Sequence, residues 1–330
     1  MAFLLARSSA LLWLRRLDAS AGQLTRYGLR VLDLEADYLR ILRHRALIET
    51  LDRPIHLLVS HRDARRRSRG VCSHLMQLPE GSYPSYMIER AVFCSAPELL
   101  MMEMATVLNE DELLFLGYEL CGSYGFDQRG KTSDRGRLCD VETMNAFARS
   151  CPGVHGRKRM AAVLPRVLDG AASPMEAALA ICLTTSVERG GLGLPAPLLN
   201  HAVPVEEQAR RLWDGEAITP DLLWPFEQSD RQPYKGVAIE YDSDENHTGA
   251  AYIARDSRRR NTLEAMGYRV ITVTNEQFAD TRELERVGIL IANYLGAPFE
   301  EAVDEAWVAR MSYHSTIRGI ALHPERLLGT

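Results

Sequence analysis

Residues 235–242 read Lys-Gly-Val-Ala-Ile-Glu-Tyr-Asp, an apolar run that ends in two acids where a buried strand ordinarily carries another Val or Leu. Successive side chains of a strand point to opposite faces, so Ala238, Glu240 and Asp242 share one face. Two carboxylates therefore project together from the end of this predicted strand. The pattern predicts a polar site at this point of the fold.

A third acid stands at the start of an earlier apolar phrase, residues 219–225, which read Thr-Pro-Asp-Leu-Leu-Trp-Pro. A hairpin through the polar linker 227–233 brings its acid, Asp221, beside Glu240. Like charges a few ångströms apart need a cation, a shared proton or strong hydrogen bonds. Because carboxylate oxygens suit Mg²⁺ or Mn²⁺, we expect Asp221, Glu240 and Asp242 to bind one of these ions.

Composition indicates a globular chain with more than one core. The 330 residues are 46% hydrophobic, which is enough for two domains. The formal net charge of −5 neither favours nor excludes nucleic acid as a partner. The six cysteines form no CxxC pair, which favours a reduced, cytoplasmic setting, and no apolar run is long enough to span a membrane. Leucines interrupted by Arg7 predict an amphipathic helix over residues 1–16.

The expected fold class is mixed α/β, with helices and strands in a C-terminal domain and a largely helical region before it. We place an N-terminal domain of unknown role at 1–160, a second domain at 170–298 and a helical tail at 299–330. The predicted elements of the second domain are a helix at 177–183, strands at 203–214, 218–224, 235–242 and 270–274, a crossover helix at 251–266 and a covering helix at 282–295.

Two further residues have both a structural and a functional interpretation. Glu176 follows Ser173-Pro174 at a helix start, where Ser, Pro and Glu form a capping box, but the same side chain can be directed at the acidic site. His247 lies five residues after the acidic pair. It is either an ordinary loop residue or the group that transfers a proton, because the pKa of a histidine lies near neutrality.

Taken in order, these residues resemble a known family. Pro220-Asp221, Glu240-x-Asp242, His247, Asp256, Arg260 and the run 267–271 are similar to the PD-(D/E)XK nuclease superfamily, nearest to very-short-patch-repair-like endonucleases and DUF559 domains. The resemblance covers roughly residues 170 to 296. It implies a restriction-endonuclease-like αβββαβ core and hydrolysis of DNA phosphodiester bonds with Mg²⁺ held by the strand-borne Asp and Glu. It also implies, by position, a Glu of the first helix near the metal, here Glu176.

Arginines follow the acids on the predicted crossover helix. Asp256 and Arg260 are four residues apart, which fits a surface ion pair. The alternative directs Arg260 towards a scissile phosphate, with Arg258 and Arg259 beside it. These three arginines are our candidates for nucleic-acid binding.

The chain departs from the family at one position, because the Lys that usually follows the Glu by two residues is Asp242. DUF559 members often show an acid there as well. Residues 94–124 are similar to the middle part of AbiEi-type antitoxins fused to DUF559 domains, which implies a defence or toxin–antitoxin setting and a protein partner for the N-terminal half. We therefore keep two hypotheses: a Mg²⁺-dependent endonuclease, and a catalytically silent module of the same fold that binds nucleic acid or protein.

Overall fold

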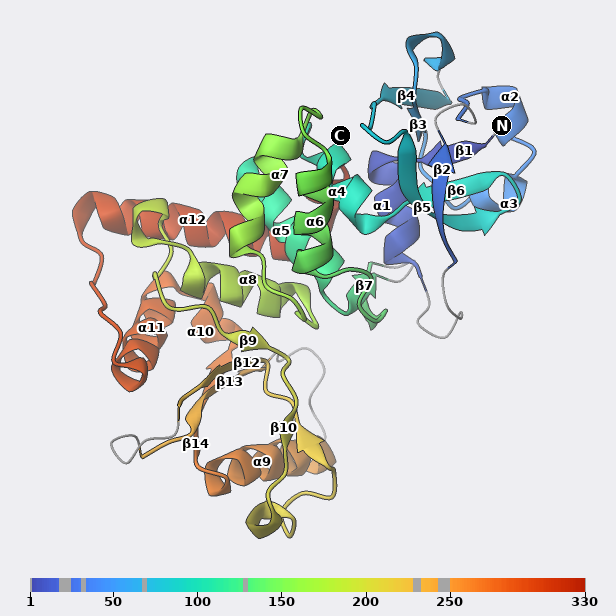
Figure 1. Cartoon of the computed structure of the whole chain (residues 1–330). Coiled ribbons are helices and arrows are strands. Elements are labelled where there is room, and N and C mark those ends of the chain that lie inside the picture. Colours follow the sequence, from blue (N-terminus) through green and yellow to red (C-terminus); the bar gives the residue numbers. More distant parts are fainter. Residues whose placement is uncertain are drawn as a thin grey trace. The chain divides into compact units, whose positions relative to one another are not determined.

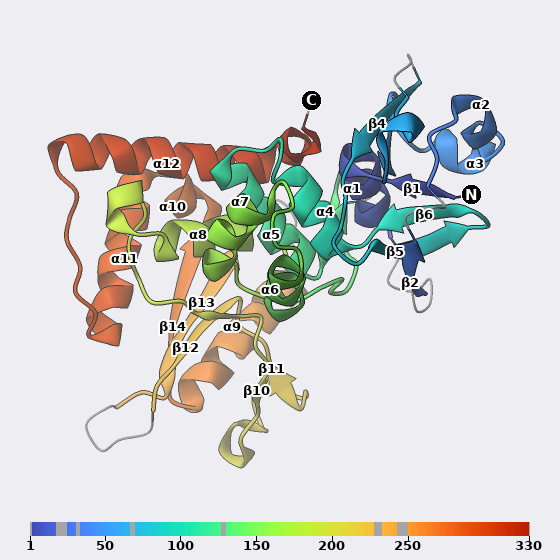
Figure 2. The ribbon, with the colours of Figure 1, turned by 45° about the horizontal axis from the view of Figure 1, so that its top comes forward.

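The two ends of the sequence belong to one unit. Met1–Val167 together with His323–Thr330 form this first unit, and Leu168–Leu322 form the second. Figures 1 and 2 show the ribbon in two views. The computed structural model describes residues 2–17, 25–30, 34–66, 70–126, 130–227, 233–242 and 250–329. His247 and the linker residues 228–232 lie outside this part of the chain.

The first unit contains a six-stranded sheet in the order β2-β5-β6-β1-β3-β4. Its strands are β1 (Phe3–Leu5), β2 (Arg26–Arg30), β3 (Ile55–Val59), β4 (Val71–Leu75), β5 (Ser82–Glu89) and β6 (Val92–Ser95). Strand β1 lies in the interior, parallel to β6 and antiparallel to β3, and all three of its apolar residues are buried. An apolar run without alternation is typical of such a doubly covered strand.

Helices make up most of the rest of this unit. They are α1 (Arg7–Arg15), α2 (Tyr38–Ile41), α3 (Arg45–Ile48), α4 (Pro97–Met104), α5 (Glu110–Cys121), α6 (Val141–Ser150) and α7 (Arg157–Val163), and a short hairpin of β7 (Tyr124–Phe126) and β8 (Thr132–Asp134) follows α5. The buried Arg15 of α1 donates to both carboxylate oxygens of Glu119 in α5 at 2.6 and 2.7 Å, and to the carbonyl of Pro324 at 3.0 Å. A bidentate pair of this kind fixes two helices relative to one another.

The six-stranded sheet of this unit differs from the largely helical region that the sequence predicts. We expected a largely helical region with a helix over 1–16, but the chain begins with β1 and only then enters α1. Strand β1 has only three residues and all of them are buried, so it shows no alternation of buried and exposed positions that the sequence could reveal.

The second unit is built on a four-stranded sheet in the order β14-β13-β12-β9. The strands of this sheet are β9 (Leu198–Leu199), β12 (Leu222–Pro225), β13 (Gly236–Asp242) and β14 (Tyr268–Thr274). The helix α8 (Pro174–Thr184) precedes them in the sequence, and α9 (Ala250–Ala265) connects β13 to β14. β12 is antiparallel to β13, whereas β14 is parallel to it and is reached through α9. Apart from β10 (Val203–Pro204) and β11 (Ala217–Ile218), which lie between β9 and β12 in the sequence, the order along the chain is one helix, three strands, one helix and one strand.

The expected strand at 203–214 is wrong. Only β10 (Val203–Pro204) is extended, and it pairs with β11 (Ala217–Ile218) in a separate two-stranded sheet. The Val205 N–H still donates to the carbonyl of Glu216 at 2.9 Å, but the chain then turns into a 3-10 helix at Glu207–Ala209, which ends the extended segment.

Helices cover both faces of the four-stranded sheet, as Figure 1 shows. Ala238 of β13 packs with Leu263 and Met266 of α9. On the other face lie α10 (Asn275–Ala279) and α11 (Thr281–Leu295), and the ring of Phe278 meets Tyr241 of β13 with centroids 6.0 Å apart. The tail after Pro298 forms α12 (Asp304–Leu322), which packs on α8. Within the described ranges, no helix has the length and apolar character that a membrane crossing requires.

Candidate functional site

The hairpin of β12 and β13 brings two distant acids together, as the sequence predicts. Leu222 pairs with Ile239, so Asp221 and Glu240 occupy the next opposed positions of the ladder. The Tyr241 backbone N–H donates to Asp221 Oδ2 at 2.6 Å. This bond fixes the Asp221 carboxylate against β13, beside Glu240.

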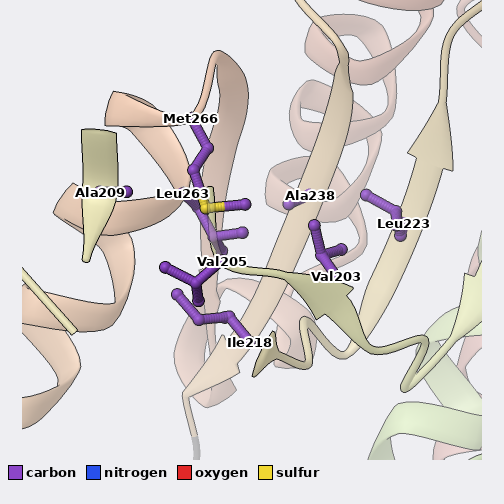
Figure 3. Close-up of a cluster of buried hydrophobic side chains, with 8 residues drawn as sticks. All are labelled: Val203, Val205, Ala209, Ile218, Leu223, Ala238, Leu263 and Met266. Carbon is purple, nitrogen blue, oxygen red and sulfur yellow. The ribbon is translucent and has the colours of Figure 1, made fainter. Parts of the chain in front are cut away.

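Strand alternation directs Glu240 towards α9. Leu223 and Ala238 belong to one buried cluster with Leu263 and Met266, seen in Figure 3, and Glu240 lies two residues beyond Ala238 on the same face. Tyr241 faces the opposite side, where its hydroxyl donates to Asn275 Oδ1 at 3.1 Å. The acids are therefore enclosed between the sheet and α9.

Arg259 of α9 joins the two carboxylates. Its Nη2 atom lies 2.9 Å from Glu240 Oε2 and 3.8 Å from Asp221 Oδ1, and the same nitrogen donates to the carbonyl of Thr219. Two oxygens from neighbouring strands thus lie within 4 Å of a single atom. The side chain of Glu240 is 9% exposed and that of Arg259 27%, so this is a largely desolvated ion pair.

The buried carboxylate of Glu176 lies at the start of α8. Ser173 caps α8 by accepting the Glu176 N–H at 3.1 Å, and Glu176 Oε2 accepts the N–H of Ala172 at 2.9 Å and the side-chain amide of Asn200 at 2.6 Å. The carboxylate is buried, and its charge acts on Asp221. The cap is therefore supplied by Ser173, while the Glu176 carboxylate closes no capping box, because it accepts from Ala172 and not from the Ser173 N–H. Its role in the acidic site stays a prediction.

Asn200 is a residue of the site that the sequence analysis missed. It lies directly after β9 with φ of 45°, in the left-handed region that Asn tolerates better than most residues. Its side chain donates to the carbonyl of Gly170 at 3.1 Å as well as to Glu176, and its backbone N–H donates to the carbonyl of Asp221 at 3.0 Å. Asn200 therefore ties the helix-borne acid to the strand-borne one. The sequence signal for it was faint: an Asn after a short Leu pair.

Two of these acids, Asp221 and Glu176, have a raised pKa. The pKa of Asp221 lies well above its ordinary value because of desolvation first, then the charges of Glu176 and Glu240, against the opposing Tyr241 N–H and Arg259. Desolvation also raises the pKa of Glu176. Three carboxylates facing one guanidinium hold excess negative charge, which a proton or a bound cation relieves.

The other predicted residues lie at the edge of this group. Asp242 is half-buried beside Thr274 at the end of β13, and no ion pair or hydrogen bond of the described residues joins it to Asp221 or Glu240. Arg258 and Arg260 are exposed on α9. The side chain of Asp256, like His247, lies outside the described part of the structure, so the sequence interpretation of both stays a prediction.

The donor chemistry of Asp221 and Glu240 suits a hard cation. Mg²⁺ is commonly bound by one or two protein carboxylates, with water and substrate phosphates completing the coordination shell. Asp221 and Glu240 offer two such carboxylates, and the cation that both approach in this structure is the Arg259 guanidinium. A three-residue His, Cys, Asp or Glu metal group is absent from the described residues. Comparisons with known protein families, curated proteins and solved structures found no match.

Proposed function

We propose that the second unit is a metal-dependent phosphodiester hydrolase of the endonuclease type, acting on DNA. The observation that carries the proposal is the approach of Asp221 and Glu240, from adjacent strands, to within 4 Å of one guanidinium nitrogen. The order helix, three strands, helix, strand supports it, because it is the order implied by the resemblance to PD-(D/E)XK nucleases. A defence or toxin–antitoxin setting stays a prediction.

The proposed roles follow from the geometry. Asp221 and Glu240 would hold Mg²⁺ or Mn²⁺, and the ion, when bound, would polarise a phosphoryl oxygen and lower the pKa of a water molecule. Asn200 and the Tyr241 N–H orient the acids. Arg259, already drawn into the acidic group, would contact a phosphate oxygen once a cation neutralises the carboxylates.

A second candidate function is favoured by the same arginine. The pair between Arg259 and Glu240 neutralises part of the acidic group without any metal, and Asp242 replaces the family's usual Lys. Both features suit a catalytically silent module that retains the fold and binds nucleic acid or protein. The two functions differ in whether cleavage occurs.

A plasmid assay separates them. Purified full-length protein is incubated with supercoiled plasmid in Mg²⁺ or Mn²⁺, and the same is done with Asp221→Asn, Glu240→Gln and the control Glu264→Gln, whose acid is exposed on α9. We expect metal-dependent nicking by the wild-type protein and by the control, and a loss of at least 100-fold for both site variants. Absence of nicking by the wild-type protein in either metal, with DNA binding retained, would instead support the silent module.

A further inference from the structure

A cavity of about 490 Å³ lies beside α9 in the second unit. Its lining residues are Leu212, Trp213, Asp214, Gly215, Arg255 and Arg258. This volume falls within the range of roughly 300–1,000 Å³ typical of sites for small organic groups. The proposed metal and phosphate roles of Asp221, Glu240 and Arg259 do not use this cavity.

Trp213 forms a fixed aromatic wall of the cavity. The indole packs against the buried cluster drawn in Figure 3, and its Nε1–H donates to the carbonyl of Ala217 at 3.2 Å. A Cβ on Gly215 would lie 2.5 Å from that Nε1, so glycine leaves the space in which the ring lies. Trp213 is nonetheless only half-buried. The protein therefore holds a large aromatic surface in place beside an open cavity.

Two arginines line the cavity with this ring. The Arg255 guanidinium lies 6.0 Å from the centroid of the Trp213 ring, at the limit of a cation–π contact, and Arg255 and Arg258 are both exposed. One acid, Asp214, also lines the cavity, so the lining carries one net positive charge. An aromatic face with arginine beside it suits a base attached to a phosphate backbone.

The cavity lies close to the acidic group along α9. Arg255 precedes Arg259 by four residues, about one helical turn, so the two side chains occupy the same side of the helix. Arg259 contacts Glu240, whereas Arg255 lies over Trp213. The cavity and the acidic group are therefore separated by about one turn of α9, roughly 6 Å along its axis.

We propose that this cavity binds an unpaired base of a single-stranded nucleic acid, next to the phosphodiester at Asp221 and Glu240. The proposal rests on the proposed function for the position of the cleaved bond. A base inside a duplex is stacked and paired, so it cannot offer its face to Trp213 without leaving the helix. Single strands, overhangs and frayed ends meet no such cost.

Binding in the absence of metal tests the proposal separately from cleavage. Fluorescence anisotropy in EDTA compares a labelled 12-nucleotide single strand with the duplex of the same sequence, using full-length protein carrying Asp221→Asn. We expect Trp213→Ala to weaken single-strand binding roughly 5- to 100-fold, with little effect on the duplex, and Trp213→Phe to retain most of the affinity. The matched control is Trp307→Ala, since Trp307 pairs with Arg282 at 5.0 Å on other elements of the same unit.

A second variant protects the test from a folding defect. Arg255→Gln changes an exposed side chain, and we expect it to weaken single-strand binding. The slope of the logarithm of affinity against the logarithm of salt concentration should fall by the amount that corresponds to about one phosphate contact. Loss of single-strand affinity in both variants supports the base site whether or not plasmid is nicked. Unchanged affinity in Trp213→Ala, or equal losses for single strand and duplex, overturns it even if nicking is observed.

Discussion

Replacing Arg259 with Met should destabilise the second unit in the absence of metal. Removing one partner of a buried ion pair costs about 3–5 kcal/mol, and an exposed pair contributes about 0–1 kcal/mol. Arg259 is 27% exposed and Glu240 9%, which places the expected loss between these limits, at about 2–3 kcal/mol. For a unit of this size the midpoint of thermal unfolding should fall by about 4–12 °C.

The same variant reports on the proposed metal site. Without the guanidinium, Asp221 and Glu240 retain uncompensated charge, so Mg²⁺ or Mn²⁺ should stabilise Arg259→Met more than the wild-type protein. At ten times the dissociation constant the recovery is about 1.4 kcal/mol.

Scanning calorimetry of the full chain, in EDTA and then with increasing Mg²⁺ or Mn²⁺, measures both effects. Arg258→Met is the control, because it changes an exposed arginine of the same helix and should alter stability by less than about 0.5 kcal/mol. An Arg259→Met protein as stable as this control, with no added response to metal, would refute the convergence of the two acids on one site.

Three other substitutions test the electrostatics of the chain. Asp221→Asn should raise the stability of the protein in EDTA at pH 7, because a carboxyl with a raised pKa in the folded state makes wild-type stability fall as the pH rises above the carboxyl's ordinary pKa. In urea titrations this gain should shrink towards pH 4. A gain that does not depend on pH would contradict the raised pKa of Asp221. Burial raises the pKa of Glu103 from 4.5 to about 7, so the stability of the wild-type protein should fall by about 3 kcal/mol between pH 4.5 and pH 7. Glu103→Gln should remove this fall, and a Glu103→Gln protein with the same pH dependence as wild type would contradict the raised pKa. Asn200→Ala should cost about 1–3 kcal/mol in urea, since it removes the bond to Glu176 and leaves a non-glycine residue at φ of 45°; unchanged stability would show that this link contributes nothing.

The acidic strand end was predictable because its signal is local. Alternation within 235–242 placed Ala238 and Glu240 on one face, and the polar linker after Trp224 indicated the hairpin that pairs β12 with β13. The shared face follows from the two-residue alternation of side chains along a strand, and the hairpin follows from the polar composition of its turn. A single sequence shows both directly.

The contribution of Arg259 was not predictable in the same way. The sequence offered three consecutive arginines, and the choice among them depends on how α9 is rotated against the sheet by Leu263 and Met266. That rotation is a property of packing, so Arg260, the residue expected to face a phosphate, lies exposed while its neighbour Arg259 reaches Glu240.

The placement of residues 323–329 with the first unit bears on how the protein is made. The carbonyl of Pro324 accepts a hydrogen bond from Arg15, the arginine that α1 pairs with Glu119. A ribosome reaches Pro324 only after translating all of Leu168–Leu322. Premature termination anywhere in that span would therefore release a first unit that lacks its closing segment, and full-length synthesis becomes a condition for completing both halves of the molecule.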